Sequence, residues 1–256
     1  MLRSLFENNP GKGAKKRKRN FWLYSVGEFV LIFLGILIAL QVDNWNQKRQ
    51  EKKLEKVLLS EMLSNLKANQ DDIENNIRMQ ERFLNSNQVA LDFLKGDQPW
   101  HDSLGIHFTY LMGGTLFDNN NSTYESLNSI GIDLVGNDSL RQQITLVYAV
   151  RYPKVEKTQD MLLSYIMDQL YPSLRANLQT VVGREITVPV DLEQLRQNNG
   201  FLEDLNMNLF IYNLSIRTYQ RALRSTKILI ADIEKELGME PGSSDSNNWV
   251  IKIDPI

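Results

Sequence analysis

The feature that most constrains this chain is an apolar run close to its N-terminus. Within the stretch 29–40, FVLIFLGILIAL, ten of the twelve residues are Leu, Ile, Phe or Val. The surrounding residues 21–42 would form a helix of about 33 Å, the thickness of a bilayer's hydrocarbon core. The favourable transfer of these side chains outweighs one off-centre carboxylate. We therefore predict a transmembrane helix over 21–42.

The flanks of the run support this interpretation over two alternatives. Trp22 and Tyr24 lie at one end and Trp45 at the other, where amphipathic rings favour the membrane interface. A cleavable signal peptide is the first alternative, but the flank QVDNWN lacks a convincing small-x-small cleavage site. A buried helix of a soluble protein is the second, and the adjacent KKRKR makes it less favourable.

The charge distribution predicts the orientation. Residues 1–20 hold seven Lys or Arg and one Glu. The rest of the chain holds 22 of its 29 basic residues and 30 of its 31 acidic residues. KKRKR at 15–19 directly precedes the span, so the positive-inside rule places the N-terminus in the cytoplasm. The same motif alone resembles a nucleic-acid or nuclear signal, but beside a span we favour topology and expect no nucleic-acid partner.

After the span the sequence predicts mostly helix, with two apolar stripes. No Pro or Gly occurs from 51 to 94, and a heptad-compatible, coiled-coil-like stripe with polar gaps such as Gln70 and Gln80 follows Leu59, Leu66, Ile73, Ile77, Leu84, Leu91 and Leu94. A second stripe alternates spacings of three and four from Leu202 to Leu237. Phe210, Ile211, Leu214, Ile228 and Leu229 widen it, which favours packing inside a multi-helix bundle.

Several local signals punctuate these helices. The first long helix is expected to end near 96–99, and Asn137 is a candidate N-cap. Pro153 and Pro172 are expected to separate or end helices. The stretch EITVPV at 185–190 is extended, and Gly238 stops the last helix.

The predicted fold class is all-α: one N-terminal transmembrane helix continues into a long stalk helix, followed by an antiparallel multi-helix bundle. The predicted boundaries are a basic cytoplasmic tail at 1–20, the span at 21–42, a helical stalk and bundle at 43–238 and a flexible tail at 239–256, in which WVIKIDPI either docks as a short strand or stays free.

The span itself holds the candidate site residues. Gly35 and Ala39 form a small-x-x-x-small pair with Gly27 on the same ridge, and small residues let two membrane helices approach closely. Ordinary membrane use of Gly and Ala is the alternative. Glu28 is a carboxylate about 10 Å inside the span, which suggests either a functional role with a partner or an interfacial position near Lys18 and Arg19.

Enzyme chemistry has little support in the sequence. There is no cysteine, and the two histidines are His101 and His107 in WHDSLGIH, where a loop metal site competes with ordinary solvated histidines. The phosphate-binding, nucleophile-elbow and zinc-protease motifs are missing. We expect no catalytic residues, no metal and no cofactor.

Two blocks carry a family resemblance. The segment YSVGEFVLIFLGILIALQVDNWNQKR at 24–49 and the segment STYESLNSIGIDLVGNDSLRQQI at 122–144 resemble a family of uncharacterised single-pass membrane proteins found mostly in Bacteroidota. Ser25 and Asp43 stand where the family pattern has Ala and Asn. The resemblance implies a membrane protein of the bacterial envelope, and the family has no established activity to carry over. Within the second block, Tyr124 and Glu125 are a candidate site, but a core helix with Tyr124, Leu127 and Ile130 on one face is the favoured interpretation.

These observations favour a non-enzymatic, membrane-anchored interaction or scaffold protein. We expect the bacterial inner membrane, with the C-terminal domain in the periplasm, an unidentified envelope protein as partner and the transmembrane helix as a route to homo-oligomers. The alternatives are a subunit of a larger membrane complex, ion-coupled through Glu28, and an exported ligand sensor. The sensor is weakened because residues 1–20 are too short for a signalling output domain.

Overall fold

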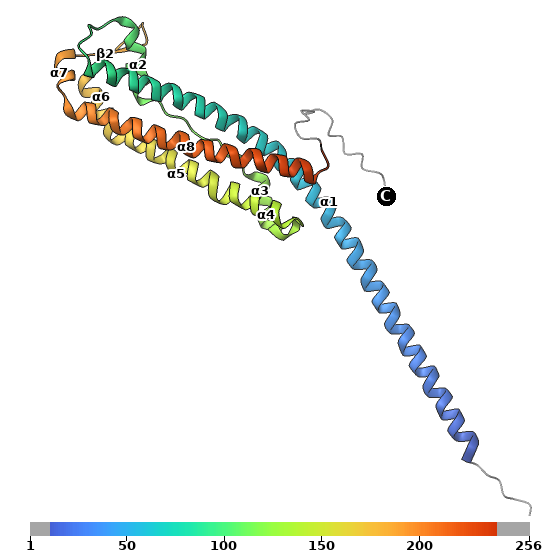
Figure 1. Ribbon diagram of the computed structural model, residues 1–256. Coiled ribbons are helices and arrows are strands. Elements are labelled where there is room, and N and C mark those ends of the chain that lie inside the picture. Colours follow the sequence, from blue (N-terminus) through green and yellow to red (C-terminus); the bar gives the residue numbers. More distant parts are fainter. Residues whose placement is uncertain (1–10, 240–256) are drawn as a thin grey trace, which may run out of the picture. The chain divides into compact units, whose positions relative to one another are not determined.

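The computed structural model describes residues 11–239, with side chains described from residue 26 onward. By its internal contacts the chain divides into two compact units, residues 1–54 and 55–256. Across residues 11–239 the fold is all-α apart from one small hairpin, as the periodicities predicted (Figure 1). The first ten residues of the predicted tail, with Arg3, and the segment WVIKIDPI lie outside the described residues.

Helix α1 (Gly11–Lys95) contains the predicted apolar run and the first predicted stripe in one element. In the second unit its stripe is buried, with Leu59, Leu66, Ile73, Leu91 and Leu94 almost inaccessible. The helix ends one residue before Gly96, close to the predicted end at 96–99. The heptad spacing thus identified the packed face of this helix correctly.

Helix α8 (Asn199–Glu236) runs antiparallel to α1, and the second stripe is buried along its length. Three side-chain pairs fix the direction: Asn87 with Asn208, Glu74 with Lys227 and Lys67 with Glu234. From one pair to the next, the residue number on α1 decreases while that on α8 increases, so the two helices run in opposite directions. The helix stops as predicted, because Gly238 has a φ of +72° and lets the Met239 N–H reach the Glu234 carbonyl at 2.9 Å.

The third long element corrects one prediction. Pro153 and Pro172 do not break the helix, which continues through α4 (Asp138–Thr145), η4 (Leu146–Arg151), α5 (Tyr152–Tyr165), η5 (Ile166–Leu170) and α6 (Tyr171–Asn177). Both η4 and η5 are π-helical, and each directly precedes a Tyr-Pro pair. The wider π turn gives the proline ring room and absorbs the missing N–H. Asn137 caps α4, as predicted.

Short elements close the end of the bundle where α1 ends and α8 begins. They are η1 (Asp102–Leu104), α2 (Gly105–Thr109), η2 (Tyr110–Met112), α7 (Leu192–Arg196) and an antiparallel hairpin of β1 (Leu178–Val181) with β2 (Ile186–Pro189). The predicted extended stretch 185–190 is confirmed as β2, whereas β1 was not predicted. At the other end lie α3 (Ser122–Ile130) and η3 (Ile132–Leu134).

The core has two clusters along the bundle, one around Tyr152 and Tyr219 and one around Phe108 and Tyr212. Two predictions of burial were partly wrong. Ile211 and Leu229 are buried, but Phe210, Leu214 and Ile228 lie on the outer face of α8. Ile130 is also exposed, because α3 ends there and the chain turns at Gly131, whose φ is +123°.

Candidate functional site

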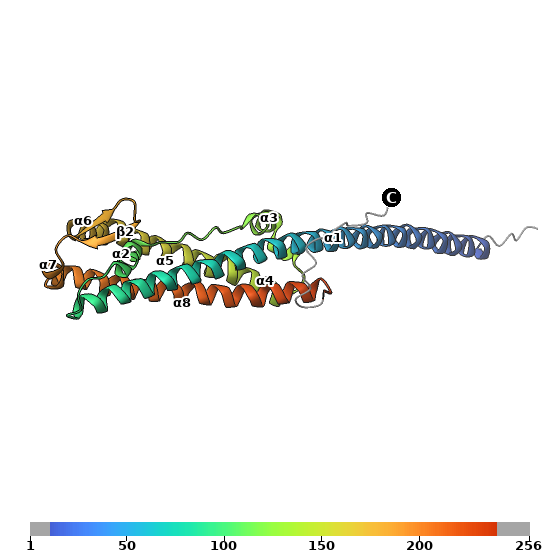
Figure 2. The same cartoon turned by 90° about the horizontal axis from the view of Figure 1, so that it is seen from above.

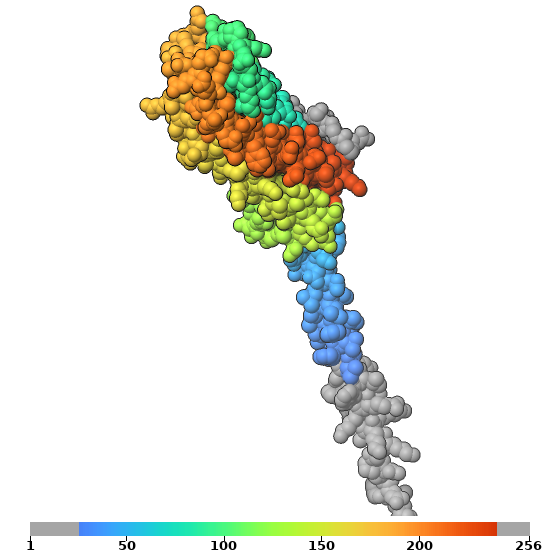
Figure 3. Space-filling model, turned by 60° about the vertical axis from the view of Figure 1, so that its left-hand side comes forward, coloured from blue at the N-terminus to red at the C-terminus, as the bar shows by residue number. Residues whose placement is uncertain are grey.

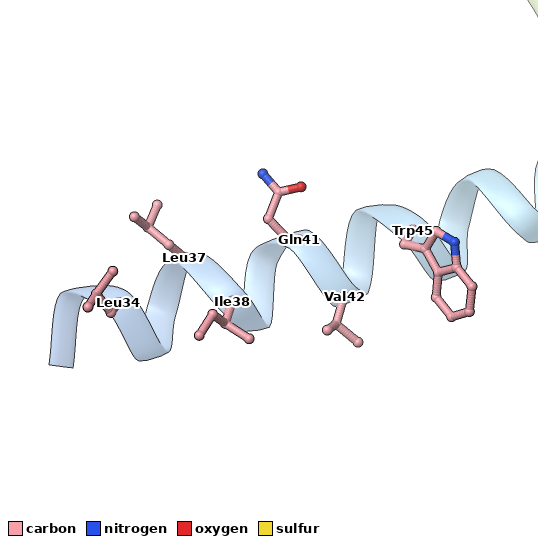
Figure 4. A pocket seen from close by; sticks show the side chains of 6 residues that line it. All are labelled: Leu34, Leu37, Ile38, Gln41, Val42 and Trp45. Atoms are coloured by element: carbon pink, nitrogen blue, oxygen red, sulfur yellow. The ribbon is translucent and has the colours of Figure 1, made fainter. Parts of the chain in front are cut away.

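In the first unit, the apolar part of α1 exposes its side chains. Every residue from 26 to 42 is exposed, and the helix is long and apolar enough to cross a membrane. A shallow groove with mostly apolar walls lies on this helix, and Figure 4 shows the side chains that line it. It is lined by Leu34, Leu37, Ile38, Gln41, Val42 and Trp45. The groove is therefore open to lipid or to another helix.

The predicted site residues lie on this same exposed stretch. A Cβ atom added at Gly27 or Gly35 would meet no atom within 4 Å. Ala39 and Glu28 are exposed as well, and Glu28 has no hydrogen bond or ion pair with any residue that the structure describes. The four positions are accessible to a partner, and their proposed roles stay predictions.

The second unit contains an arrangement of buried polar side chains that the sequence analysis did not identify. Residues 113–121, here called the extended segment, have no regular secondary structure and run beside α1 between η2 and α3 (Figures 1 and 2). Asn69 binds both backbone groups of Asn120: its amide donates to the carbonyl at 3.1 Å, and its oxygen accepts from the N–H at 2.9 Å. Asn76 donates to the Leu116 carbonyl at 3.0 Å.

The register of these contacts follows from simple geometry. Asp72 accepts from the N–H of Asp118, and Asn65 donates to Thr123 just beyond the segment. One turn of α1, about 5.4 Å, thus matches about two residues of extended chain, about 6.6 Å. Side-chain amides on one face of α1 therefore pair with the segment's backbone, as a neighbouring β-strand would.

The opposite side of the extended segment is held by the other long helices. Gln159 of α5 accepts the Phe117 N–H at 2.7 Å, and Tyr212 of α8 donates to the Gly113 carbonyl. Asn208 donates to the Leu111 carbonyl at 2.9 Å and to Asn87 of α1 at 2.7 Å. The three long helices are thereby joined through the extended segment and the adjoining η2.

Aromatic rings pack around the centre of this arrangement. Phe117 lies edge-on to Tyr152 with ring centroids 5.0 Å apart, and Tyr152 lies edge-on to Tyr148. Tyr124 stacks on Tyr148 at 4.7 Å with nearly parallel rings. Tyr124 is therefore part of the packed core, the interpretation that the sequence favoured over a site. Glu125 is on the surface and accepts from Asn121 at 2.8 Å.

Burial also shifts the ionisation of groups near the extended segment. It raises the pKa of Asp72, although hydrogen bonds from the Asp118 N–H and the Asn76 amide favour the charged form, and the Asp118 carboxylate adds to the rise. Burial likewise raises the pKa of Tyr219 to about 12. The Tyr219 hydroxyl therefore stays neutral at physiological pH and acts as a hydrogen-bonding group.

The two histidines have separate local partners. His101 Nδ1 lies 2.7 Å from the Ser103 hydroxyl, whereas His107 Nδ1 lies 3.2 Å from the Ser86 hydroxyl. Across residues 26–239, no three His, Asp or Glu side chains gather closely enough to hold a metal ion. A cavity of about 150 Å³ lies between α2, α6 and the hairpin, beside Phe108, Tyr171, Arg175 and Thr187. That is smaller than the usual pocket for a drug-sized ligand.

A signal for the buried amides was present in the sequence. Asn65, Asn69, Asn76, Gln80 and Asn87 recur on one face of a helix that is otherwise apolar there. Gln80 was predicted only as a polar gap, together with Gln70, which donates to Glu74 four residues along the same helix. An amide side chain has both a donor and an acceptor. When such side chains recur on a buried helix face, they indicate that a neighbouring segment of backbone is hydrogen-bonded there.

Within the part of the chain that the structure describes, the fold is all-α with one candidate membrane-spanning helix, which belongs to the same helix α1 as the buried stripe. Residues 28–163 match a family of unknown function, DUF6090, over more than half of the chain. The chain belongs to this family. No curated protein and no solved structure matches it.

Proposed function

We propose that this protein is a membrane-anchored, non-enzymatic interaction or scaffold module of the bacterial cell envelope. One observation carries the proposal: α1 passes without interruption from the exposed apolar residues 26–42 into the packed stripe that begins at Leu59. A partner that binds the bundle is thereby tethered at the bilayer. The basic KKRKR before the span supports a cytoplasmic N-terminus and an exported bundle.

The bundle's polar interior fits a structural role. Its buried amides bond to the extended segment, and its buried tyrosines bond to partners such as Thr226 and the Gly113 carbonyl. These contacts specify one arrangement of three helices, which suits a rigid surface that presents side chains to a partner.

The proposal is tested by purifying the full chain from membranes in mild detergent. We expect it to remain in the pellet after alkaline carbonate extraction and to bring down a reproducible envelope protein. A control chain has residues 26–42 replaced by a Leu-Ala span of equal length. Retention of the partner by this control assigns binding to the bundle, and its loss assigns binding to the span. A chain found in the soluble fraction, or one without a reproducible partner, would contradict the proposal.

A second candidate is favoured by Glu28, an exposed carboxylate on the apolar helix. In this version the chain is a subunit of a larger membrane complex, and the carboxylate contacts a partner or carries a proton in the bilayer. Glu28→Leu should keep or improve membrane insertion, because the span becomes more apolar, yet should reduce recovery of the partner.

Glu28→Gln separates the two roles of the carboxylate. A hydrogen-bonding role survives the amide in part, whereas a proton-carrying role does not, because an amide does not titrate. If both variants insert, retain the partner and complement a deletion strain like the wild type, then Glu28 is interfacial and this second candidate is wrong.

A further inference from the structure

The outer face of α8 carries a regular line of exposed residues. The spacing alternates three and four along Met207, Phe210, Leu214, Arg217, Arg221, Arg224 and Ile228, here called the outer seam. Its apolar members are unusually accessible: Met207 is 43% exposed, Phe210 65%, Leu214 39% and Ile228 53%. Figure 3 shows the outer surface of α8, orange to red, uncovered along the bundle.

This spacing is the pattern by which one helix packs against another. Alternating steps of three and four keep the side chains on one line facing a partner helix. The bundle already uses the inner stripe of α8, from Leu205 to Ile233, for its own core. The outer seam covers three heptads, about 32 Å of helix. Single exposed apolar residues are ordinary on a surface, but four on one seam indicate an interface.

The centre of the seam is positively charged and has no internal counter-charge. Arg217, Arg221 and Arg224 make no hydrogen bond or ion pair with the described part of the chain. Some other arginines of the bundle do have acidic partners: Arg141 contacts Asp138, and Arg184 contacts Asp102 at 2.9 Å. A partner helix therefore needs acidic side chains opposite the middle of the seam.

A second copy of this chain does not satisfy the seam. A parallel pair would place the three arginines against the same three arginines. An antiparallel pair centred on Arg217 would place Arg217 against its copy, with Arg221 opposite Leu214 and Arg224 opposite Phe210. Neither arrangement neutralises the charge, and unneutralised like charges weaken association.

A flat bilayer surface fits the seam less well than a helix does. The apolar side chains fall into two groups, Met207 to Leu214 and the single Ile228, separated by the three arginines. Insertion into lipid is strongest for a continuous apolar face. A helix with apolar ends and an acidic centre matches the order of the seam.

We propose that the outer seam docks an amphipathic helix of another protein, with Asp or Glu at its centre and apolar side chains toward its ends. This inference rests on the proposed function as an interaction module and names the chemistry of the partner. The aromatic Phe210 would be the main apolar anchor, and the arginines would select the acidic partner and fix its register.

The test places a photo-crosslinking phenylalanine derivative at Phe210 or Ile228 of the full chain in its native membrane. The control position is Gln220, which is exposed on α8 but lies off the seam. We expect one protein to crosslink at both seam positions and not at Gln220, through a peptide with acidic residues in a heptad pattern. Arg221→Glu should lower the crosslink yield at Phe210 about ten-fold, whereas Arg221→Lys should retain most of it.

Arg82→Glu is the matched control, since it reverses one exposed arginine on α1. It should leave the yield unchanged, and equal melting temperatures of all variants should show that folding is intact. Crosslinking to a second copy, to lipid alone, equally at Gln220, to nothing or independently of Arg221 would overturn the inference. If the partner still co-purifies in detergent in any of these cases, the docking site is wrong while the proposed function stands.

Discussion

Asn69 and Asn120 form a two-way pair in which one side chain satisfies both backbone groups of another residue. Such a contact matters because its side chain has little access to water, and an unpaired buried donor or acceptor keeps the full cost of desolvation. Asn69 is 1% exposed. At the scale of single residues, the amides of α1 therefore stabilise the bundle in addition to its apolar side chains.

Replacing Asn69 with Ala should lower the free energy of unfolding by about 1–3 kcal/mol, because a buried side chain loses two part-buried hydrogen bonds to the Asn120 backbone. The matched control is Asn75→Ala on the exposed side of the same helix, which should change it by less than about 0.5 kcal/mol. Thermal unfolding of the full chain in detergent, followed by circular dichroism, measures both. Equal effects of the two substitutions would show that the amide pairing contributes nothing.

Asp72 gives a prediction about pH. Burial raises its pKa above the ordinary value of 3.8, so the charged form is less favourable in the folded protein than in the unfolded chain. The contribution of Asp72 to stability is therefore fully present below about pH 4 and is lost as the pH rises through the raised value. Asp72→Asn, which keeps an acceptor for the Asp118 N–H, should remove that loss.

Unfolding midpoints of the wild type and of Asp72→Asn should thus diverge as the pH rises above about 4, with the variant the more stable protein above the raised pKa of Asp72. Other carboxylates titrate in both proteins, so the difference between the two curves is the quantity to examine. A difference that does not change with pH would contradict the assignment.

At the scale of elements, the extended segment depends on a close approach at its start. A Cβ atom at Gly113 would overlap the ring of Phe83, and the carbonyl of Gly113 is held by the Tyr212 hydroxyl. The segment enters the bundle between these two rings. A larger residue here has to displace either Phe83 or the backbone.

Gly113→Ala should therefore lower the unfolding free energy by about 1–3 kcal/mol, the usual cost of overpacking. Gly136→Ala provides the control, because its Cβ would meet only the Glu55 carboxylate oxygen at 3.8 Å. Comparing the melting temperatures of the two variants checks the prediction. If Gly113→Ala is tolerated as well as Gly136→Ala, the segment is not held tightly between the rings.

Sequence periodicity predicted the long helices well, for a physical reason. The stripes from Leu59 to Leu94 and from Leu202 to Leu237 are local patterns, and a helix repeats its buried face every three or four residues. The helix stop at Gly238 and the cap at Asn137 are local too. The extended segment could not be predicted in this way, because its partners Asn69 and Gln159 lie about forty or more residues away.

Two other misses have different causes. Pro153 and Pro172 were expected to interrupt helices, but two π-helical segments accommodate them, and that choice depends on the tertiary packing of the element. Phe210, Leu214 and Ile228 were assigned to the core because they are apolar. Periodicity alone does not say whether a second seam faces the interior or a partner.

At the scale of the whole molecule, the candidate site residues Gly27, Glu28, Gly35 and Ala39 lie on the exposed apolar stretch that is long enough to cross a membrane. The sequence predicted this stretch from composition alone. The roles of the four residues depend on a partner, so they stay predictions. In the second unit, the amide hydrogen bonds hold the helices and the extended segment in one arrangement. The apolar stripes alone did not predict these bonds.

The most direct test of the account is the side of the membrane on which the bundle lies. A fluorescent protein that matures only in the cytoplasm is fused after Ile256, and the signal in the membrane fraction is compared with that of the same reporter fused before Met1. KKRKR ahead of the span predicts a dark C-terminal fusion and a bright N-terminal fusion at equal protein levels. A bright C-terminal fusion would place the bundle in the cytoplasm and contradict the proposal of an exported, membrane-anchored module.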